Sequence, residues 1–455
     1  MKTLIAVESP HKAKVIQAFL GSNYIVLPTV GHFKEMPLSK NMTSAQKEKY
    51  GDYALDFSNN FEPLFKTMTG SQKVITAFKD ALKKVDELVI GTDCDMEGHL
   101  IGLLLIKELK PTIPTYRATW NEITKQAVEA GLAAKNKVDL AKGLPADFIN
   151  GAESALTRGS WDRLYGFATS PYVWATIRSG TSSGRVQTPG SRLVVERELK
   201  RLAFKSVSFY SITGDFDGVP ATLIEVAGKK IASGANIDDE GLVADGYVLL
   251  TDENIGKVLA FLEKRKYEVG TVTSKPYRRS APPPFMTSSA LQAIGGKTGM
   301  SSKQITSIFQ NLYQNGEITY IRTVSVVAAP EAIQAARKSI EKNFGKKFLP
   351  AKAKEFKDKK AGNSGHECIR VTLDSKGDFL VRTYTDSKVQ KVFDIISRRM
   401  LASQAIDCEG ITWTASFVAT DGQAKFTASE TEIHEPGWTV IYAPDDDDTT
   451  VAVTD

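Results

Sequence analysis

The segment of residues 88–102, LVIGTDCDMEGHLIG, constrains the fold more than any other part of the chain. An apolar run leads into three carboxylates at alternate positions, Asp93, Asp95 and Glu97. Residues two apart in an extended chain point to the same side, so these acids would crowd together where a buried strand ends. Like charges this close repel, and Mg²⁺, which takes oxygen ligands, would relieve the repulsion. For the pattern alone, a solvated acidic turn is the alternative.

The N-terminal residues predict a second strand end beside these acids. Residues 3–7 (TLIAV) read as a buried strand with Glu8 at its carboxyl end. A helix follows, because Ser9 can cap it and Pro10 suits its first turn. Lys12 then lies in that first turn, close to Glu8.

A further strand at residues 24–30 closes on Gly31 and His32. With the strand at 88–92 and the helix after it, the pattern predicts a parallel α/β sheet. Open α/β sheets place their sites at the carboxyl ends of the strands. We therefore expect Glu8 to meet the three acids, which favours a metal site over an acidic turn.

Composition limits the class of protein. The chain is 42% hydrophobic and 24% charged, as in soluble globular proteins, and no apolar run approaches the ~20 residues that span a bilayer. The start reaches an acid too soon for a signal peptide. Three cysteines without a C-x-x-C pair predict a reducing compartment and no structural zinc. The net charge of +5 permits a polyanion partner, and Asp445–Asp448 read as a disordered acidic end.

From about residue 151 the chain predicts helices rich in arginine and aromatic residues. Arginine pairs with phosphate in a bidentate manner, and aromatic faces stack on unpaired bases, worth roughly 1–3 kcal/mol each. The alternative is a helical bundle with aromatic residues inside and arginines on its surface. The residues concerned are Arg158, Arg163, Arg185 and Arg192 among Trp161, Tyr165, Phe167 and Trp174.

Two later runs, at 203–275 and 410–429, alternate apolar and polar residues and predict antiparallel strands. The second carries a hairpin signal at Asp421-Gly422. We interpret both runs as one β domain interrupted by an insertion.

The insertion predicts two capped helices and then Tyr320, with Arg322 on the same face if the chain is extended. A lone Tyr-x-Arg among 14 tyrosines would be a weak signal for a nucleophile. Lysines crowd residues 337–360. They read as a solvated helix and loop or, alternatively, as contacts to a nucleic-acid backbone.

Several motifs together resemble the type IA DNA topoisomerases. V-E-S-P-H-K-A-K, G-H-F-K-E-M-P and D-C-D-M-E-G resemble the family's Toprim domain, in the correct order. S-x-G-R-V-Q-T-P, P-F-x-T-S-x-L-Q, L-Y-x-x-G-x-I-T-Y-x-R-T and G-H-E-C-I-R-V-T resemble its later segments. The chain departs from the family pattern at Met96, His99, Phe167 and Val324, where the family commonly has Arg, Glu, Tyr and Asp.

The resemblance implies a multidomain α/β protein with helical DNA-binding domains and a β-rich arch, forming a torus. The predicted domains are Toprim (1–148), helical single-strand DNA-binding (149–202, completed by about 436–455), first half of the arch (203–275), inserted domain with the active-site tyrosine (276–399) and second half of the arch (400–435). It also implies a cytoplasmic monomer that acts on single-stranded or underwound DNA of a nucleoid, virus or plasmid, with Mg²⁺ or another divalent ion.

The implied reaction is single-strand cleavage through a 5′-phosphotyrosyl link, strand passage and religation, which relaxes negative supercoils, decatenates DNA, or both. ATP is not required, and the chain has no G-x-x-x-x-G-K-[ST] loop. The implied DNA contacts are Arg158, Asp162, Arg163, Phe167, Arg185, Gln187, Thr188, Thr319, Thr323 and His32.

Chemistry assigns the remaining roles. A tyrosine has an ordinary pKa near 10, so Tyr320 needs cations or a base to attack a phosphodiester. Arg322 and Lys12 can stabilise charge on the phosphoryl oxygens, and Glu8 can act as general acid and then base. His366 would hydrogen-bond the phosphate. The metal ligands would be Asp93, Asp95 and Glu97, with Glu8 beside them.

Two other classes remain open on sequence alone. A Toprim primase or nuclease would keep Glu8 and the acids but would not use Tyr320. A non-catalytic single-strand-binding scaffold would keep the arginine-rich helices and could lose both sites, and Val324 favours this alternative.

Overall fold

The computed structural model describes residues 1–138, 145–358 and 366–442. The acidic end at Asp445–Asp448 and the end of the predicted range 436–455 lie outside these residues. The chain divides into two units, one of residues 1–185 and 282–405 and the other of residues 186–281 and 406–455. The boundary at 185/186 falls inside the range predicted as one helical domain, and the domain limits stay a prediction.

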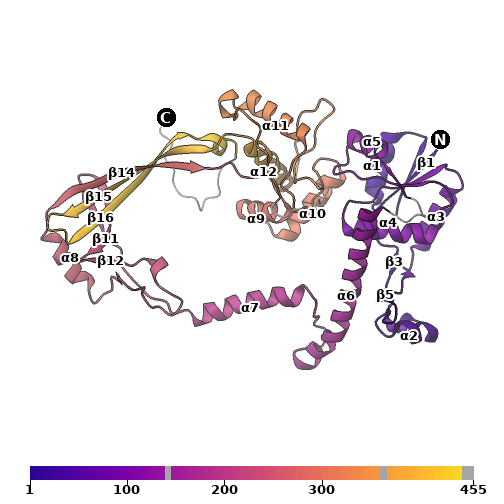
Figure 1. Cartoon of the computed structure of the whole chain (residues 1–455), viewed down its shortest axis with the longest axis horizontal. Helices are drawn as coiled ribbons and strands as arrows, with labels where there is room; N and C mark the ends of the chain where they lie inside the picture. The colour runs from indigo at the N-terminus through magenta and orange to yellow at the C-terminus, as the bar shows by residue number, and fades with distance from the viewer. Residues whose placement is uncertain (139–144, 359–365, 443–455) are drawn as a thin grey trace. The chain divides into compact units, whose positions relative to one another are not determined.

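The first unit contains the parallel sheet that the sequence predicts, in the order β2-β1-β7-β8-β9 (Figure 1). Strand β1 pairs in parallel with β2 and β7, and only β9 runs antiparallel to its neighbour in this sheet. The strands are β1 (Thr3–Val7), β2 (Tyr24–Pro28), β7 (Glu87–Ile90), β8 (Thr115–Arg117) and β9 (Asn136–Val138). The helices of this part are α1 (Pro10–Leu20), α3 (Gln72–Leu82), α4 (Met96–Leu109) and α5 (Lys125–Ala133).

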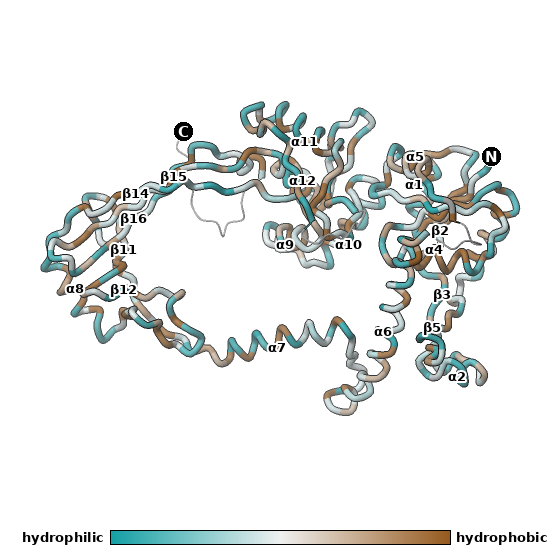
Figure 2. The backbone as a smooth tube through the Cα atoms, in the orientation of Figure 1, coloured by the Kyte–Doolittle hydropathy of each residue, from teal (hydrophilic) through white to brown (hydrophobic). Residues whose placement is uncertain are grey.

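Helix α4 lies at the centre of the hydrophobic core of this part, because most of its own side chains are apolar and buried. Its residues from Leu100 to Ile106 are buried with β1 and β7, and this region is the brown part around β2 and α4 in Figure 2. Helix α6 (Ala146–Thr176) packs closely on α4. A methyl group on Gly102 would come within 2.7 Å of Ile90 and 3.1 Å of the Phe148 ring. Glycine at this position therefore lets the three elements approach.

A small extension leaves the parallel sheet between β2 and α3. It contains two short antiparallel pairs, β3 with β6 and β4 with β5, and a capped helix. The bounds are β3 (Lys34–Glu35), α2 (Ser44–Tyr50), β4 (Leu55–Asp56), β5 (Glu62–Pro63) and β6 (Lys66–Thr67). It reaches along α6 in Figure 1, and the Ser160 hydroxyl on α6 donates to the Phe61 carbonyl at 3.4 Å.

The inserted part of the first unit is mainly helical. The two capped helices that the sequence predicts are present, and the Ser301 side chain caps the second by accepting from Gln304 N at 3.4 Å. The helices are α9 (Thr287–Thr298), α10 (Ser302–Gln314), α11 (Pro330–Asn343) and α12 (Ser387–Ser403).

The second unit contains one sheet of seven strands built from both β runs of the sequence. Strands β14 and β16 flank β15, and the Asp421-Gly422 hairpin joins β15 to β16 as predicted. Stacked rings of Phe216 and Phe417, 4.3 Å apart, form part of its core. The elements are α7 (Gln187–Ala203), β10 (Thr213–Phe216), β11 (Val219–Val226), β12 (Lys229–Ile231), β13 (Tyr247–Val248), α8 (Ile255–Glu263), β14 (Tyr267–Arg279), β15 (Cys408–Ala419) and β16 (Ala424–Glu435).

No helix in the described part of the chain is long and apolar enough to cross a membrane.

Candidate active site

The end of β1 and the start of α1 hold a buried charge network. The Ser9 hydroxyl caps α1 by accepting from Lys12 N at 3.1 Å. Lys12 is only 3% exposed, and its Nζ lies 3.0 Å from Glu8 Oε2 and 2.6 Å from each carboxylate oxygen of Asp93. The backbone N–H of Asp93 donates to Glu8 Oε1. The structure brings Glu8 to Lys12 and to Asp93, the first of the three acids that it was expected to meet.

Burial changes the protonation of this network. Burial and the neighbouring Asp93 raise the pKa of Glu8, although Lys12 opposes the shift. Burial alone would lower the pKa of Lys12, but Asp93 and Glu8 raise it overall. Lys12 is therefore a permanent cation between two carboxylates, and Glu8 holds a proton more readily than an exposed glutamate.

The expected extended arrangement of the three acids is wrong. Strand β7 ends at Ile90, and Asp95 is already the N-cap of α4, with its Oδ1 accepting from Gly98 N at 2.7 Å. Glu97 lies in the first turn of the helix. The period-two rule therefore does not apply across these positions. Among residues 1–138, 145–358 and 366–442, no three His, Cys, Asp or Glu side chains gather closely enough to hold a metal ion.

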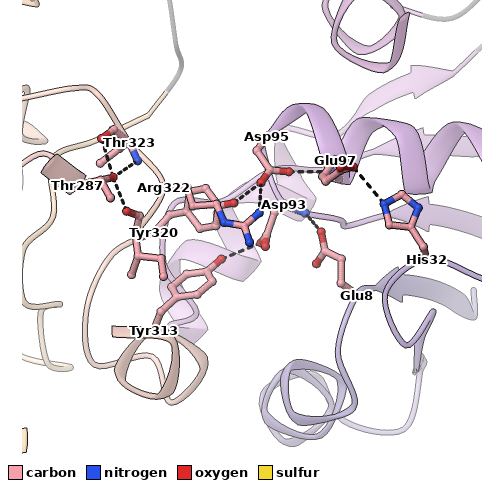
Figure 3. A network of polar contacts seen from close by, with 12 residues as sticks. Glu8, His32, Asp93, Asp95, Glu97, Thr287, Tyr313, Tyr320, Arg322 and Thr323 are labelled. Atoms are coloured by element: carbon pink, nitrogen blue, oxygen red, sulfur yellow. Dashed lines mark hydrogen bonds and ion pairs between the residues drawn. The ribbon is translucent and has the colours of Figure 1, made fainter. Parts of the chain in front are cut away.

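Instead, each acid contacts a different group of the protein (Figure 3). Glu97 faces His32, whose Nε2 lies 3.0 Å from its carboxylate. Asp95 accepts a hydrogen bond from the Tyr320 hydroxyl and lies 3.4 Å from Arg322 Nη1. Burial would raise the pKa of Asp95, but its contacts with Tyr320, Gly98 and Arg322 lower it overall.

Tyr320 is carried to Asp95 by the inserted part of the chain. Its ring is 6% exposed, and its backbone N–H donates to the Asn121 carbonyl at 2.8 Å. The His366 ring stacks on it, with centroids 5.7 Å apart. Burial, followed by Asp93 and Asp95, raises the pKa of Tyr320 well above its ordinary value. The phenol is therefore neutral in this arrangement.

Sequence reasoning missed Tyr313, whose hydroxyl points to Asp93 in Figure 3. Its side chain is fully buried, and its hydroxyl donates to Asp93 Oδ1 at 2.9 Å. Lys12 Nζ lies 5.1 Å from its ring centroid, and the Tyr320 ring meets it edge-on at 5.2 Å. Its position in the L-Y-x-x-G-x-I-T-Y motif, on the face of α10 that is buried, was the available signal.

Arg117, also missed, fixes the loop between β7 and α4. Its guanidinium is buried, and it donates to the carbonyls of Ile90 and Asp93, both at 2.9 Å. A single arginine inside Y-R-A-T-W gives no separate signal in the sequence. The contact holds the acidic loop against the sheet.

Several predicted DNA contacts gather at α6 and the segment that follows it. Arg185 Nε donates to Asp162 Oδ1 at 2.8 Å, and Arg158 lies 3.9 Å from both Asp162 and Glu97. Arg158 and Arg185 line a pocket of about 760 Å³ with Trp161 and Met96. The pocket thus begins beside the acidic loop.

Four other predicted DNA contacts, Arg163, Phe167, Gln187 and Thr188, do not line this pocket. Arg163 donates to the Pro37 carbonyl at 3.0 Å and covers the Phe167 ring. Gln187 and Thr188 lie exposed at the start of α7, in the second unit.

Thr319 and Thr323 are buried, which does not agree with direct DNA contact. The Thr319 hydroxyl donates to the Cys368 carbonyl at 2.7 Å, and the Thr323 hydroxyl accepts from Ser325 N at 3.0 Å. Both hydroxyls hold the loop that carries Tyr320. Val324, by contrast, is 77% exposed.

Together, the fold and the site define a protein with a Toprim-type sheet whose acidic loop meets a tyrosine from an inserted helical part. The Toprim domain family matches residues 3–123, and the DNA topoisomerase family matches residues 147–454. The chain belongs to the type IA DNA topoisomerase family. A Toprim domain indicates the use of a divalent metal ion.

Individual relatives agree. The chain is 34% identical to DNA topoisomerase 1 of Streptomyces coelicolor, covering all of this chain and 48% of the relative. It is also 34% identical to DNA topoisomerase 1 of Synechococcus elongatus, covering all of this chain and 51% of the relative. The chain thus spans about half the length of these curated relatives. The solved structure of full-length topoisomerase I from Thermotoga maritima matches 99% of this chain and 68% of that chain, with a TM-score of 0.76 at 26% identity.

Proposed function

We propose that the protein cleaves one DNA strand through Tyr320, passes another strand through the break and reseals it. The observation that supports this most directly is the hydrogen bond from the Tyr320 hydroxyl to Asp95, with Arg322 beside it. A nuclease or primase that used only the acidic loop would have no need of a tyrosine held there. A passive scaffold would have no need of a buried Lys12–Glu8–Asp93 network.

The residues of the candidate site can supply the nucleophile, a proton acceptor and a proton donor for a transesterification. The Tyr320 oxygen attacks phosphorus, and Asp95, which already accepts its hydrogen bond, is placed to take the phenolic proton. Arg322 stabilises charge on the phosphoryl oxygens, whereas the buried Lys12 acts through Glu8 and Asp93, which it holds in place. The bond from phosphorus to the 3′ oxygen breaks, and Glu8, whose pKa is raised, supplies the proton to that oxygen. Religation reverses these steps, with the 3′ hydroxyl as nucleophile and Tyr320 as leaving group.

The acids as arranged do not fit a bound magnesium ion. Lys12 and Tyr313 contact Asp93, whereas Arg322 and Tyr320 contact Asp95. A site made by Asp93, Asp95 and Glu97, with Glu8 beside them, requires the release of all of these aspartate contacts. It also requires His32 to release Glu97. No step of the proposed chemistry is assigned to the ion, and Mg²⁺ binding stays part of the proposal.

The proposed substrate is single-stranded or underwound DNA in the cytoplasm, and the proposed outcome is relaxation of negative supercoils, decatenation, or both. ATP is not needed, because the phosphotyrosyl link preserves the energy of the broken bond. We expect the protein to act as a monomer.

A trapping assay with end-labelled single-stranded DNA tests the function. The protein and its Tyr320→Phe variant are incubated with DNA, with Mg²⁺ and after chelation, and then denatured. We expect a covalent adduct on the 5′ phosphate with the unchanged protein and none with Tyr320→Phe, because only the phenolic oxygen can form the link. The variant loses one oxygen from a packed ring, so its unfolding temperature serves as the control for folding.

Two results would contradict the proposal. Cleavage that survives Tyr320→Phe would indicate a Toprim nuclease, and DNA binding without any adduct, whatever divalent ion is supplied, would indicate a scaffold. An adduct of equal yield after chelation would contradict the metal part alone.

A further inference from the structure

The β4–β5 hairpin presents two phenylalanines to solvent. Strands β4 and β5 pair Leu55 with Pro63, and the turn between them runs from Phe57 to Phe61. Phe57 is 50% exposed and Phe61 is 46% exposed. Phenyl rings left this open on a small hairpin expose apolar surface that folding does not bury, and such surface often marks a binding site.

The turn is built to hold these rings in place. Asp56 is 2% exposed, and its carboxylate accepts from the Ser58 backbone N–H at 3.0 Å and the Ser58 hydroxyl at 2.6 Å. Asn60 and Phe61 both have left-handed backbone conformations, with φ of 49° and 58°. A bulky residue is uncommon there, and strain of this kind concentrates at functional positions.

The two rings belong to a continuous aromatic row that reaches α6. Phe61 contacts Phe57 with centroids 5.3 Å apart, Phe57 contacts Tyr53 at 5.9 Å, and Tyr53 contacts Phe167 at 6.4 Å. Phe167, itself 39% exposed, carries the Arg163 guanidinium on its face. One end of the row is therefore a residue of the predicted single-strand groove.

A pocket joins the hairpin to that groove. About 670 Å³ lies between the turn and α6, with Phe61 on one side and Trp161, which is 52% exposed, on the other. Trp161 also lines the pocket that contains Arg158 and Arg185. The same aromatic residue thus faces both spaces.

We propose that Phe57 and Phe61 of the β4–β5 hairpin, with Tyr53 just before it, form a second base-stacking site, which binds unpaired bases of the DNA strand beyond the arginine-lined groove. This inference rests on the proposed function, because it assigns a further part of the path of the same strand. Exposed aromatic faces suit stacking with any base. The row continues from residues predicted to bind DNA, which favours a nucleic-acid strand over an apolar peptide as the occupant.

The charges around the hairpin define the kind of contact. Glu62 and Glu153 line the pocket beside Phe61, and neither favours phosphate. Binding there would thus come from stacking, whereas Arg158 and Arg185 would neutralise phosphates. Stacking releases no counterions, so this site should not contribute to the salt dependence of binding.

Binding of fluorescent single-stranded oligonucleotides tests the inference. All variants carry Tyr320→Phe, so that no covalent link forms. We expect Phe57→Ala and Phe61→Ala each to weaken binding of a long oligonucleotide at least about fivefold, the lower end for one stacked base. The slope of log K against log salt should not change. Phe57→Tyr, which keeps the ring, should restore affinity. Trp413→Ala, which removes a 44% exposed ring on β15, is the matched control.

Oligonucleotides with single abasic positions make the test specific. One abasic position should lie at the hairpin. There, loss of the base should weaken binding by the Tyr320→Phe parent protein but not by the double variant that also carries Phe57→Ala and Phe61→Ala. Equal affinity of parent and variants for every oligonucleotide would overturn the second site and leave the proposed function intact. Failure of the parent protein to bind single-stranded DNA at all would overturn both.

Discussion

At the scale of single residues, Ser9 and Tyr313 position the charged groups of the candidate site, Ser9 by capping α1 and Tyr313 by donating to Asp93. Ser9 caps α1 and thereby brings Lys12 to Glu8, as helix-start signals indicate. Tyr313 was missed because its role depends on a contact with Asp93, 220 positions away. The arrangement of the acids was wrong because α4 begins within the motif, at Met96, with Asp95 as its cap.

Tyr313 gives the first prediction at this scale. Tyr313→Phe keeps the buried ring but removes the hydrogen bond to Asp93. A hydrogen bond to a charged group contributes about 1.5–3 kcal/mol, so we expect the initial rate of covalent adduct formation to fall roughly ten- to hundredfold. Rapid-quench measurement of the adduct reports that rate.

The control is Tyr384→Phe, which removes a phenolic oxygen elsewhere in the inserted part, where the Tyr384 ring packs on Phe393. An unchanged rate in Tyr313→Phe, or an equal loss in both variants, would show that Tyr313 has no special role in positioning Asp93.

At the scale of helices and strands, periodicity predicted the long elements and missed the short ones. The parallel strands and the joined β runs follow from apolar patterns that extend over several residues. Strands β3 to β6 contain two residues each and carry no period, so neither the extension nor its exposed phenylalanines could be predicted. The contact between α4 and α6 was also invisible, because it depends on Gly102 and Phe148 meeting in space.

A pH prediction belongs to that helix pair. The His99 ring on α4 packs on Phe148 at 5.4 Å, and burial, with Arg117 nearby, lowers the pKa of His99 to about 4. The unfolded chain has the higher pKa, near 6.5, so it binds more protons between the two values. The free energy of unfolding should therefore fall as pH decreases from 6.5 toward 4.

Urea unfolding across this range measures the effect. His99→Gln removes the titrating group and should lose less stability on acidification than the parent protein, while the two pH profiles run parallel above pH 6.5. Identical profiles below that pH would show that His99 does not titrate on unfolding.

The attachment of the tyrosine-bearing part to the sheet gives another prediction. The buried Arg370 guanidinium lies 3.1 Å from Glu122, which follows β8, and 2.7 Å from Glu367. Arg370→Met leaves two partly buried carboxylates without their cation, and breaking such a pair costs about 3–5 kcal/mol. We expect a clear fall in unfolding temperature, measured by calorimetry.

Glu122→Gln is the informative partner, because it keeps a polar group and leaves Arg370 paired with Glu367. It should destabilise the protein less than Arg370→Met. The reverse order would mean that the contact across to Glu122 carries most of the energy.

At the scale of the whole molecule, family membership and the pairing of distant segments follow from motifs spread along the sequence. Tyr320 reaches Asp95 across 225 positions, and only the joint resemblance of several motifs predicted that meeting. The net charge does not predict the partner, because +5 over 455 residues is compatible with many partners. In the proposed function, the positions of the positive charges, rather than their sum, decide where DNA would bind.

The salt dependence of binding reports how many positively charged side chains contact phosphates. The slope of log K against log salt changes by about 0.7 for each phosphate contact to a single strand. Arg158 and Arg185 line the pocket beside the acidic loop, so Arg158→Gln and Arg185→Gln should each reduce the slope by about that amount. Two lysines of the lysine-rich segment serve as the comparison. We expect Lys346→Gln and Lys347→Gln to leave the slope unchanged, because these side chains are read as solvated rather than as phosphate contacts. Anisotropy titrations at several salt concentrations, in the Tyr320→Phe background, measure all four. A reduced slope for the lysine variants and none for the arginine variants would move the DNA path from α6 to the inserted part.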